Sequence, residues 1–361
     1  MDLLQKARQE INEVDKEMAK LFVRRMNAVA DVAKYKQEHG LPVFDGAREA
    51  QVIQKNAALV EDDELRAYYV NYIQNNMAIS RSYQHKILEG MRVAYCGTEG
   101  AFAHIATGRL FPTSKRIAYG DFALAYRAVE NGECDAAVLP VENSYNGEVG
   151  QVTDLMFSGN LYVNALLELA VTQDLLVVPG TKLEDIKEVI SHPQALGQCA
   201  EYIRAQGWDQ HEYSNTALAA KYVAQRADKN IAAIASEEAA EMFGLQVLAR
   251  NINSSRNNTT RFAVFSRSQN EQRQTESGEI FILMFTVKNE AGSLAKAIDV
   301  IGRYGFNMRC LRSRPMKELM WQYYFYVEAE GCVHSPAGDA MMRDLSIFCD
   351  RLKMVGTYSK N

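Results

Sequence analysis

The sequence lacks the features that mark secreted, membrane and metal-binding proteins. Its six cysteines are dispersed and form no CxxC pair, so neither a disulfide framework nor a zinc site is expected. No apolar run approaches the length of a transmembrane helix, and the first residues lack the apolar stretch of a signal peptide. We therefore expect a cytoplasmic protein that uses no membrane, no metal and no other cofactor.

Charge and composition are those of an ordinary globular protein. The net charge of −5 gives no reason to expect nucleic acid as a partner. No repeat or low-complexity tract is present, and 47% of the residues are hydrophobic and 24% charged. At 361 residues the chain is long enough for two or three domains, and the polar stretch 266–278 is a plausible linker.

The N-terminal segment carries apolar residues at alternating spacings of three and four, the pattern of a long helix packed against other helices. This seam comprises Leu4, Ala7, Ile11, Val14, Met18, Leu21, Ala28, Val32 and Tyr35. Arg25 interrupts it. A guanidinium keeps its charge on burial, so Arg25 needs a carboxylate partner or an anionic ligand, unless the side chain reaches the surface.

Lys36 lies within about 20° of Arg25 on the same helix face, at about 100° per residue. A further helix is expected from Leu65 to Ile87, with two polar residues in its seam. That seam comprises Ile73, Met77, Ser80, Gln84 and Ile87. Residues 39–42 end the first helix, and Asp45 can cap a short helix between the two long ones. Together these residues describe a small, cation-rich pocket inside a helical bundle.

Arg8 adds an expectation about assembly. It lies about 25 Å from Arg25 along one helix axis, too far for both side chains to hold one small molecule. If Arg8 serves such a pocket, the pocket belongs to another subunit. The sequence therefore favours an intertwined homodimer or a higher homo-oligomer.

These residues resemble the all-helical chorismate mutases over the first 90 positions. The matching segments are Ala7-Arg8-Gln9-Glu10-Ile11 through Val14-Asp15, Arg24-Arg25, Lys34-Tyr35-Lys36, Pro42-Val43-Phe44-Asp45, Arg48-Glu49, Ser80 and Gln84. The resemblance implies that Arg25, Arg48 and Arg8 of the partner subunit bind the two carboxylates of chorismate.

The resemblance also assigns catalysis to Lys36 and Gln84, which donate hydrogen bonds to the ether oxygen of chorismate. It further implies that Glu49 accepts from the ring hydroxyl and that Ser80 and Asp45 complete the wall of the pocket. A pericyclic rearrangement needs no nucleophile and no proton transfer, only a folded substrate and donors aimed at the oxygen that gains charge. Gln84 donates at neutral pH without titration.

From Arg92 onward, short apolar strands alternate with helices. The expected strands are 93–95, 136–139, 175–178, 188–190 and 231–234, with helices such as 123–130 and 217–225. This pattern predicts an α/β domain with parallel character. Polar residues at the strand-to-helix junctions 143–144, 191–194 and 214–216 act as helix caps, and helix N-termini that converge at one sheet edge also form an anion site.

Three segments in this region resemble the signatures of prephenate dehydratases. They are Leu139-Pro140-Val141-Glu142-Asn143-Ser144 with Gly147, Ser191-His192-Pro193-Gln194-Ala195-Leu196-Gly197-Gln198-Cys199, and Thr259-Thr260-Arg261-Phe262. The resemblance implies two α/β lobes, similar to periplasmic ligand-binding proteins, with the active site in the cleft between them. It places Asn143, Ser144, Gln194, Thr260 and Arg261 at the substrate prephenate. The segment 97–104 departs from the family, which usually has Pro at position 98.

Thr260 is the position that the resemblance marks as essential for dehydration. The reaction forms an aromatic product, so the enzyme chiefly helps the ring hydroxyl to leave while carbon dioxide departs. We interpret Thr260 as a hydrogen-bond donor polarised by its neighbours, with Asn143 and Gln194 as positioning groups. His192 and Glu142 are candidate proton sources on residue type alone, and His192 before a proline has an equal claim to a structural role.

The last 80 residues predict strand, helix, strand, strand, helix, strand, the ferredoxin-like order. The expected segments are 279–287, 292–304, 307–316, 321–328, 337–349 and 352–358. They resemble the ACT regulatory domain, in which phenylalanine binds at a subunit interface. The matching effector positions are Gly292-Ser293-Leu294 and Ser313-Arg314-Pro315. The family has Ala at position 293 and an acid at position 312, where this chain has Ser and Arg.

The order of domains is therefore a helical mutase at 1–90, a dehydratase at 91–268 and an ACT domain at 279–361. These resemblances imply a multidomain bifunctional enzyme of phenylalanine biosynthesis that converts chorismate through prephenate to phenylpyruvate. A second hypothesis is a non-catalytic sensor of small molecules, which would not need the complete mutase set. A third keeps one active site and loses the other.

Overall fold

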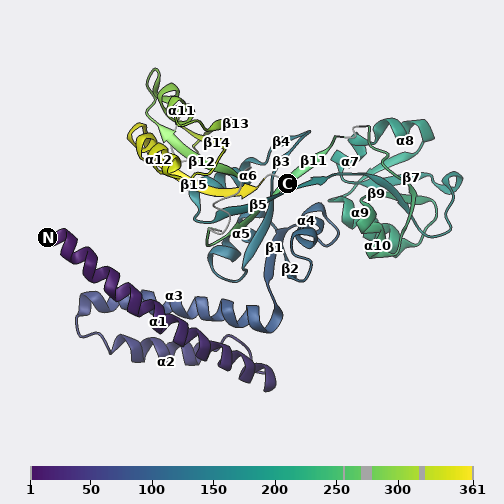
Figure 1. The fold of residues 1–361 in the computed structure, drawn as a ribbon. Coiled ribbons are helices and arrows are strands. Elements are labelled where there is room, and N and C mark those ends of the chain that lie inside the picture. Colours follow the sequence, from purple (N-terminus) through teal and green to yellow (C-terminus); the bar gives the residue numbers. More distant parts are fainter. Residues whose placement is uncertain (1, 255–256, 270–278, 317–321, 360–361) are drawn as a thin grey trace. The chain divides into compact units, whose positions relative to one another are not determined.

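The computed structural model describes residues 2–254, 257–269, 279–316 and 322–359 (Figure 1). These residues form two units. The first contains residues 1–92 with the short segments 113–115 and 131–135, and the second contains the remainder of the chain.

The first unit is built from three helices, as the sequence predicts. They are α1 (Leu3–Glu38), α2 (Gly46–Ala57) and α3 (Asp63–Glu89), and α1 and α2 both pack against α3. Asp2 caps α1, and the helix ends at His39 before Gly40, whose φ of 64° favours glycine. The carboxylate of Asp45 accepts from the backbone N–H of Arg48 at 3.0 Å, which confirms it as the cap of α2.

The apolar seam of α1 is largely uncovered in the single chain. Ile11 is 58% exposed and Leu21 is 61% exposed, and Leu4, Val14 and Tyr35 are exposed as well. Ala33 is the buried residue of this helix. Most of the seam has no packing partner among the described residues of one chain, because α3 covers only part of a helix about 50 Å long.

The second unit begins with a lobe around one sheet, here called the first lobe. Its strands are β1 (Arg92–Cys96), β2 (Lys115–Tyr119), β3 (Ala136–Asn143), β4 (Gly147–Glu148), β5 (Tyr162–Ala170) and β11 (Thr259–Ser266). Helices α4 (Phe102–Leu110), α5 (Phe122–Glu130) and α6 (Gly150–Ser158) accompany them. The strand order β5-β11-β3-β1-β2 places β11 between β5 and β3.

The second lobe has its own sheet, ordered β10-β6-β9-β7-β8. Its strands are β6 (Asp174–Val177), β7 (Glu188–Ser191), β8 (Asp209–Glu212), β9 (Ile231–Ala235) and β10 (Gln246–Ala249). Its helices are α7 (Pro193–Gln198), α8 (Ala200–Gln206), α9 (Thr216–Arg226) and α10 (Glu237–Phe243), with a short 3₁₀ helix at Leu183–Asp185. Buried clusters around Val189 and Ile190 fill the two faces of this sheet.

Both sheets are mixed, so the expected parallel character holds only in part. β1 pairs parallel with β3, and β7 pairs parallel with β8 and β9. In contrast, β11 runs antiparallel to β3 and β5, and β6 runs antiparallel to β9 and β10. The antiparallel partners come from segments that cross between the lobes, and their apolar sequences do not encode direction.

The C-terminal module, residues 279–359, has the predicted strand and helix order. It comprises β12 (Glu279–Val287), α11 (Ser293–Arg303), β13 (Asn307–Pro315), β14 (Tyr323–Glu330), α12 (Pro336–Phe348) and β15 (Cys349–Ser359). The strand order β13-β14-β12-β15 is that of a ferredoxin-like fold, and α11 and α12 pack against each other (Figure 1). Residues 270–278 of the predicted linker and Trp321 lie outside the described residues.

The sheet of the C-terminal module joins that of the first lobe through β15 and β5. Gly356 pairs with Val163, and a Cβ on Gly356 would overlap the carbonyl group of Val163. The close approach therefore requires glycine at this position.

Among the described residues, no helix is long and apolar enough to span a membrane, and no cluster of three His, Cys, Asp or Glu side chains has metal-binding geometry. All six cysteines are described, and none of them forms a disulfide.

Candidate active sites

In the helical unit, the cation that interrupts the apolar seam contacts α3. Arg25 donates to the hydroxyl of Ser80 at 2.5 Å and to the carbonyl of Asn76 at 3.4 Å. Ser80 is buried and itself donates to the same carbonyl at 2.6 Å. The structure thus brings together two predicted site residues, and it gives Arg25 no carboxylate partner among the described contacts.

The other predicted mutase residues occupy different environments. The ammonium of Lys36 donates to the carbonyl of Val43 at 2.5 Å, which ties α1 to the loop before α2. Arg48 and Arg8 are exposed in the single chain. The carboxylate of Asp45 serves as the cap of α2.

Two features of α2 and α3 bear on the pocket. Glu49 forms an ion pair with Arg81, which also lies over the ring of Phe44 at 5.8 Å. Sequence reasoning missed Arg81, although its spacing from Gln84 and Met77 marks it as facing the same side of α3.

Gln84 is buried, and its Oε1 has no hydrogen-bond partner among the described residues. An unpaired buried amide oxygen is costly unless a hydrogen-bond donor satisfies it.

A pocket of about 280 Å³ lies between the two lobes of the second unit. Its wall comprises Ala101, Phe102, Asn143, Val171, Gln173, His192, Gln194, Ala195, Gln198, Ser214, Asn215, Thr216, Asn258 and Thr260. Residues at the N-terminal ends of α4, α7 and α9 belong to this wall. Their free backbone amides favour an anion, as the sequence predicts for this sheet edge.

Asn143 and Thr260 are bonded to each other in this pocket. The side-chain amide of Asn143 donates to the Thr260 hydroxyl at 2.9 Å and to the Asn258 side chain at 2.8 Å. Its carbonyl oxygen accepts from the backbone N–H groups of Tyr145 and Asn146, which fixes the amide orientation. Because the Thr260 oxygen accepts from Asn143, its own proton is available for a ligand.

Two lobe-linking contacts surround this pair. Asn258 donates to the side chain of Gln198 at 3.3 Å, and Asn215 donates to the hydroxyl of Thr98 at 3.1 Å. Thr98 is the residue that departs from the family pattern, and here it accepts a hydrogen bond from the opposite lobe. Sequence reasoning missed Asn258, for which the polar run before Thr259 was the available signal.

The remaining predicted dehydratase residues divide between the pocket and other places. Gln194 and His192 line the pocket, and His192 Nδ1 accepts from the backbone N–H of Gln194 at 3.3 Å. Ser144 is outside the pocket wall: its hydroxyl donates to the Asn257 carbonyl and accepts from the Thr259 N–H.

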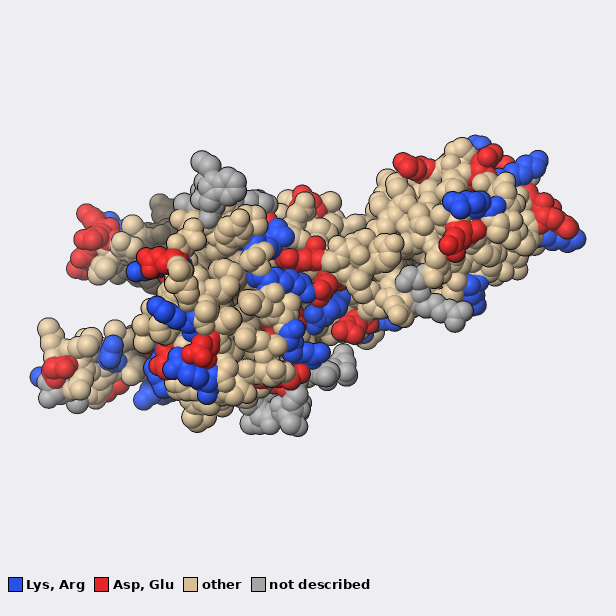
Figure 2. Space-filling view, turned by 90° about the horizontal axis from the view of Figure 1, so that it is seen from above, with Lys and Arg blue, Asp and Glu red and all other residues tan. Residues whose placement is uncertain are grey.

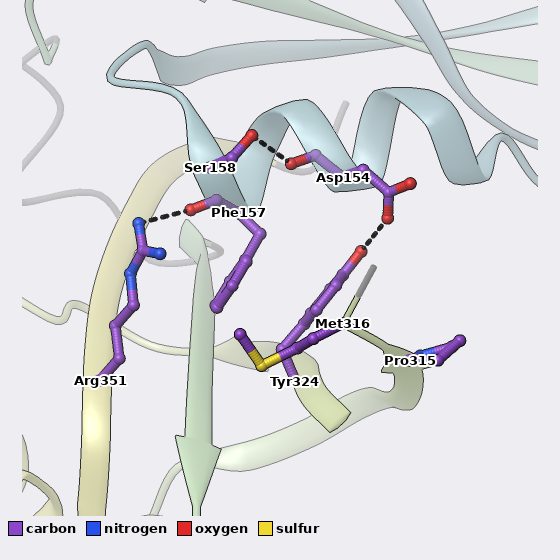
Figure 3. A pocket seen from close by; sticks show the side chains of 7 residues that line it. All are labelled: Asp154, Phe157, Ser158, Pro315, Met316, Tyr324 and Arg351. Atoms are coloured by element: carbon purple, nitrogen blue, oxygen red, sulfur yellow. Dashed lines mark hydrogen bonds between the residues drawn. The ribbon is translucent and has the colours of Figure 1, made fainter. Parts of the chain in front are cut away.

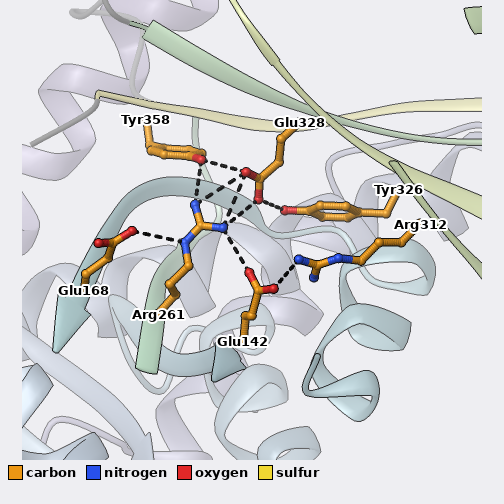
Figure 4. A network of polar contacts seen from close by, with 7 residues as sticks. All are labelled: Glu142, Glu168, Arg261, Arg312, Tyr326, Glu328 and Tyr358. Carbon is orange, nitrogen blue, oxygen red and sulfur yellow. Dashed lines mark hydrogen bonds and ion pairs between the residues drawn. The ribbon is translucent and has the colours of Figure 1, made fainter. Parts of the chain in front are cut away.

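Arg261 and Glu142 also lie outside the pocket wall and belong to a separate polar network (Figure 4). Arg261 donates to Glu142 and Glu328 at 3.2 Å and to the Tyr358 hydroxyl at 2.8 Å. Burial alone would lower the pKa of Arg261, but Glu328 and Tyr358 hold it above its usual value. Glu142 is engaged with two arginines, Arg261 and Arg312, so the hypothesis that it supplies a proton in the pocket is wrong.

The predicted effector residues are not all in one place. A pocket of about 360 Å³ is lined by Leu294 together with Lys288, Glu290, Tyr323 and Asp350, among others. Gly292 is the N-cap of α11 with a φ of 81°, and Ser293 begins that helix. Ser313 pairs with Phe325 in the sheet and is not in the pocket wall.

Arg314 points toward the first lobe rather than that pocket. It donates to Asp154 of α6 at 3.2 Å, and Tyr324 donates to the same carboxylate at 2.7 Å. Figure 3 shows the cavity of about 140 Å³ beside this contact, where the rings of Phe157 and Tyr324 stack at 4.3 Å. Arg351 closes the far side by donating to the carbonyl of Phe157 at 2.9 Å.

The charged side chains outside these sites are mixed in sign. On the face drawn in Figure 2, basic and acidic groups lie side by side, in keeping with a net charge of −5. That face therefore offers no extended field of one sign that would attract a polyanion.

Comparison with known families matches both units. The model for chorismate mutase type II matches residues 7–85, and the model for prephenate dehydratase matches residues 93–270. The chain is 29% identical over 366 residues to a bifunctional chorismate mutase/prephenate dehydratase of Enterobacter agglomerans, covering 97% of this chain and 94% of that one. It is 30% identical to arogenate dehydratase/prephenate dehydratase 2 of Arabidopsis thaliana, covering 85% and 84% of the two chains.

Solved structures also resemble this chain over about three quarters of its length. A protein described as a novel type of quorum quenching acylase matches with a TM-score of 0.69 and 30% identity, covering 75% of this chain and 98% of that one. A prephenate dehydratase of Arthrobacter aurescens in complex with L-Phe matches with a TM-score of 0.68 and 24% identity, covering 75% and 90%. At 24% identity, the match to the Arthrobacter aurescens structure shows a similar fold alone.

Proposed function

The chain belongs to the family of bifunctional chorismate mutase/prephenate dehydratases and is an enzyme of phenylalanine biosynthesis with both activities; we propose the residues that perform each step and the assembly that this requires. The helical unit rearranges chorismate to prephenate. The two-lobed domain, formed by the first and second lobes and here called the dehydratase domain, decarboxylates and dehydrates prephenate to phenylpyruvate. The reactions take place in the cytoplasm, which the dispersed cysteines without disulfides favour.

In the mutase site, Arg25 binds a carboxylate of chorismate while Ser80 holds the guanidinium in place. Lys36 and Gln84 donate to the ether oxygen as its bond to carbon breaks. Gln84 is buried one helical turn from Ser80 on α3, which supports its place in this pocket. The substrate needs only to be held in its folded conformer and to have its developing charge stabilised. Glu49, Arg48 and Asp45 complete the wall from α2.

The mutase site is shared between two subunits. The exposed apolar seam of α1 supports this assembly, because an exposed stripe of that length is otherwise costly in water. Pairing of α1 with another copy covers the seam and carries Arg8 of the partner subunit to the carboxylates of the bound substrate. We therefore propose an intertwined homodimer as the minimal active unit.

In the dehydratase site, Thr260 donates a hydrogen bond to the ring hydroxyl of prephenate as it leaves. The carbon–carbon bond to the departing carboxylate supplies the electron pair that makes the ring aromatic, and the hydroxyl leaves with a proton as water. Asn143 polarises Thr260, and this hydrogen bond is the observation that carries the assignment. Gln194 and the N-terminal ends of α4 and α9 bind the carboxylates of prephenate.

The C-terminal module is proposed to be an ACT domain that binds phenylalanine and inhibits the dehydratase. Its ferredoxin-like strand order and the pocket beside Leu294 support this role. The free amides at the start of α11 can bind the carboxylate of an amino acid.

Incubation of the purified protein with chorismate tests both activities together. We expect chorismate to disappear, prephenate to pass through a maximum and phenylpyruvate to accumulate. A parallel incubation with prephenate alone reports the dehydratase without the mutase. Loss of chorismate without phenylpyruvate, in protein that also leaves prephenate unchanged, would contradict the assignment of the second site.

A further inference from the structure

The polar network of Figure 4 connects the C-terminal module to the two strands that carry the dehydratase residues. Glu142 comes from β3 and Arg261 from β11, whereas Arg312 and Glu328 come from β13 and β14. Arg312 forms an ion pair with Glu142, and Glu328 accepts from Arg261 at 3.2 Å. The side chain of Glu328 is only 5% exposed.

The network lies on the face of the sheet opposite to Asn143 and Thr260. In the sheet register Thr260 faces Asn143, and the next pair along the strands is Arg261 with Glu142. Successive side chains of a strand point to opposite faces. Asn143 and Thr260 therefore face the pocket, while Glu142 and Arg261 face the C-terminal module.

The backbone pairing between β3 and β11 is irregular beside this network. The register between β3 and β11 shifts between Arg261 and Phe262, which leaves Val141 without a ladder partner. The adjacent residue is Pro140, which has no N–H to donate. The end of β3 that carries Asn143 pairs with β11 and with β4, and the Glu142 side chain adds contacts to two cations, of which Arg312 is one.

Charge balance gives Arg312 a specific part in this arrangement. Each oxygen of the Glu142 carboxylate accepts from a different arginine: Oε1 from Arg312 and Oε2 from Arg261. Removal of Arg312 leaves one oxygen of a half-buried carboxylate unpaired and lets the carboxylate rotate toward Arg261. Either movement is transmitted to Asn143, the next residue of the strand.

We propose that Arg312 is a positioning residue of the dehydratase reaction, acting through Glu142 to hold Asn143 against Thr260. The C-terminal module is then part of the catalytic scaffold as well as a place for regulation. This inference rests on the proposed roles of Asn143 and Thr260.

The test compares Arg312→Ala, Arg312→Lys and the matched control Arg303→Ala in the full chain. Arg303 is an exposed arginine of the same module that pairs with Asp299 on α11. With prephenate as substrate, we expect Arg312→Ala to lower kcat about tenfold or more with a smaller change in KM, because misplacement of a donor acts mainly in the transition state. Arg312→Lys keeps the charge and should recover part of kcat, and Arg303→Ala should match the parent.

A double-mutant cycle with Glu142→Gln separates positioning from general damage. If Arg312 acts through Glu142, adding Arg312→Ala to Glu142→Gln should lower kcat little further. Independent, multiplying effects, or an Arg312→Ala enzyme with kcat within twofold of the parent, would overturn the proposal. Circular dichroism and the thermal unfolding temperature of every variant report whether the dehydratase domain and the C-terminal module are folded.

Thr260→Ala, measured in the same series, distinguishes the two levels of inference. Full activity of Thr260→Ala contradicts the proposed dehydratase site itself. A large loss in Thr260→Ala with an unchanged Arg312→Ala contradicts only the positioning role.

Discussion

The side-chain amide of Asn143 donates a hydrogen bond to the hydroxyl oxygen of Thr260 at 2.9 Å. The two residues stand opposite each other on β3 and β11, and the carbonyl end of the amide is fixed by two backbone N–H groups. A hydroxyl that already accepts in this way is a better donor to a third group, since hydrogen bonds in a chain polarise one another. The pair therefore sets both the position and the strength of the donor.

Substitution of Thr260 tests this donor directly. Thr260→Ala removes the hydroxyl with little volume, so we expect phenylpyruvate formation to fall by on the order of 10²-fold or more while the fold and the mutase survive. Thr260→Ser keeps the donor and should retain far more activity. Steady-state rates with prephenate measure both, and equal rates for alanine and serine would remove any chemical role for the hydroxyl.

Local patterns predicted the elements of this chain well, but not how separate segments meet. The caps at Asp45 and Asn215, and the bounds of β12, follow from spacing and residue type. The ion pair of Glu142 could not be predicted from the sequence. Its partner Arg312 lies 170 residues away on β13, and only the fold brings the two side chains together. Arg81 was missed for a similar reason: a charged residue on α3 gains its partner Glu49 only through packing.

Lys36 provides the corresponding test of the mutase. Lys36→Ala should abolish prephenate formation, because the donor to the ether oxygen is lost, while dehydration of supplied prephenate persists. Chorismate consumption and phenylpyruvate formation are measured on the same preparation. A folded variant that loses both activities equally would contradict two separate sites.

Mixing of two inactive variants tests the shared site. In heterodimers of Arg8→Ala and Lys36→Ala chains, one of the two sites contains both substitutions and the other contains neither. We expect chorismate mutase activity to reappear on mixing, up to about half of the parent's activity per heterodimer. Subunit exchange is verified with differently tagged chains, and exchange without recovery would count against the intertwined dimer.

Gly356 offers a test of the junction between the C-terminal module and the first lobe. Gly356→Ala places a methyl group on the carbonyl of Val163, so we expect thermal unfolding at a lower temperature, with a loss of about 1–3 kcal/mol. The matched control is Gly302→Ala in α11, where a Cβ meets nothing within 4 Å and the helix gains about 0.5–1 kcal/mol. If Gly356→Ala unfolds at the same temperature as the parent, β15 does not pair tightly with β5.

Regulation by phenylalanine is the remaining expectation, and the pocket beside Leu294 gives it a location. Its wall combines apolar side chains with Lys288, Glu290 and Asp350, which suit the ring, the carboxylate and the ammonium group of an amino acid. Bound phenylalanine should lower dehydratase activity, with a coupling of about 1–3 kcal/mol between the two sites.

Leu294→Ala should weaken both binding and inhibition severalfold, whereas the exposed Ile347 of α12 can be replaced by Ala without effect. Calorimetry with phenylalanine, alongside assays with supplied prephenate, measures both quantities. Absence of binding at millimolar phenylalanine would contradict a regulatory role of the C-terminal module. The positioning role of Arg312 would then be its one proposed function.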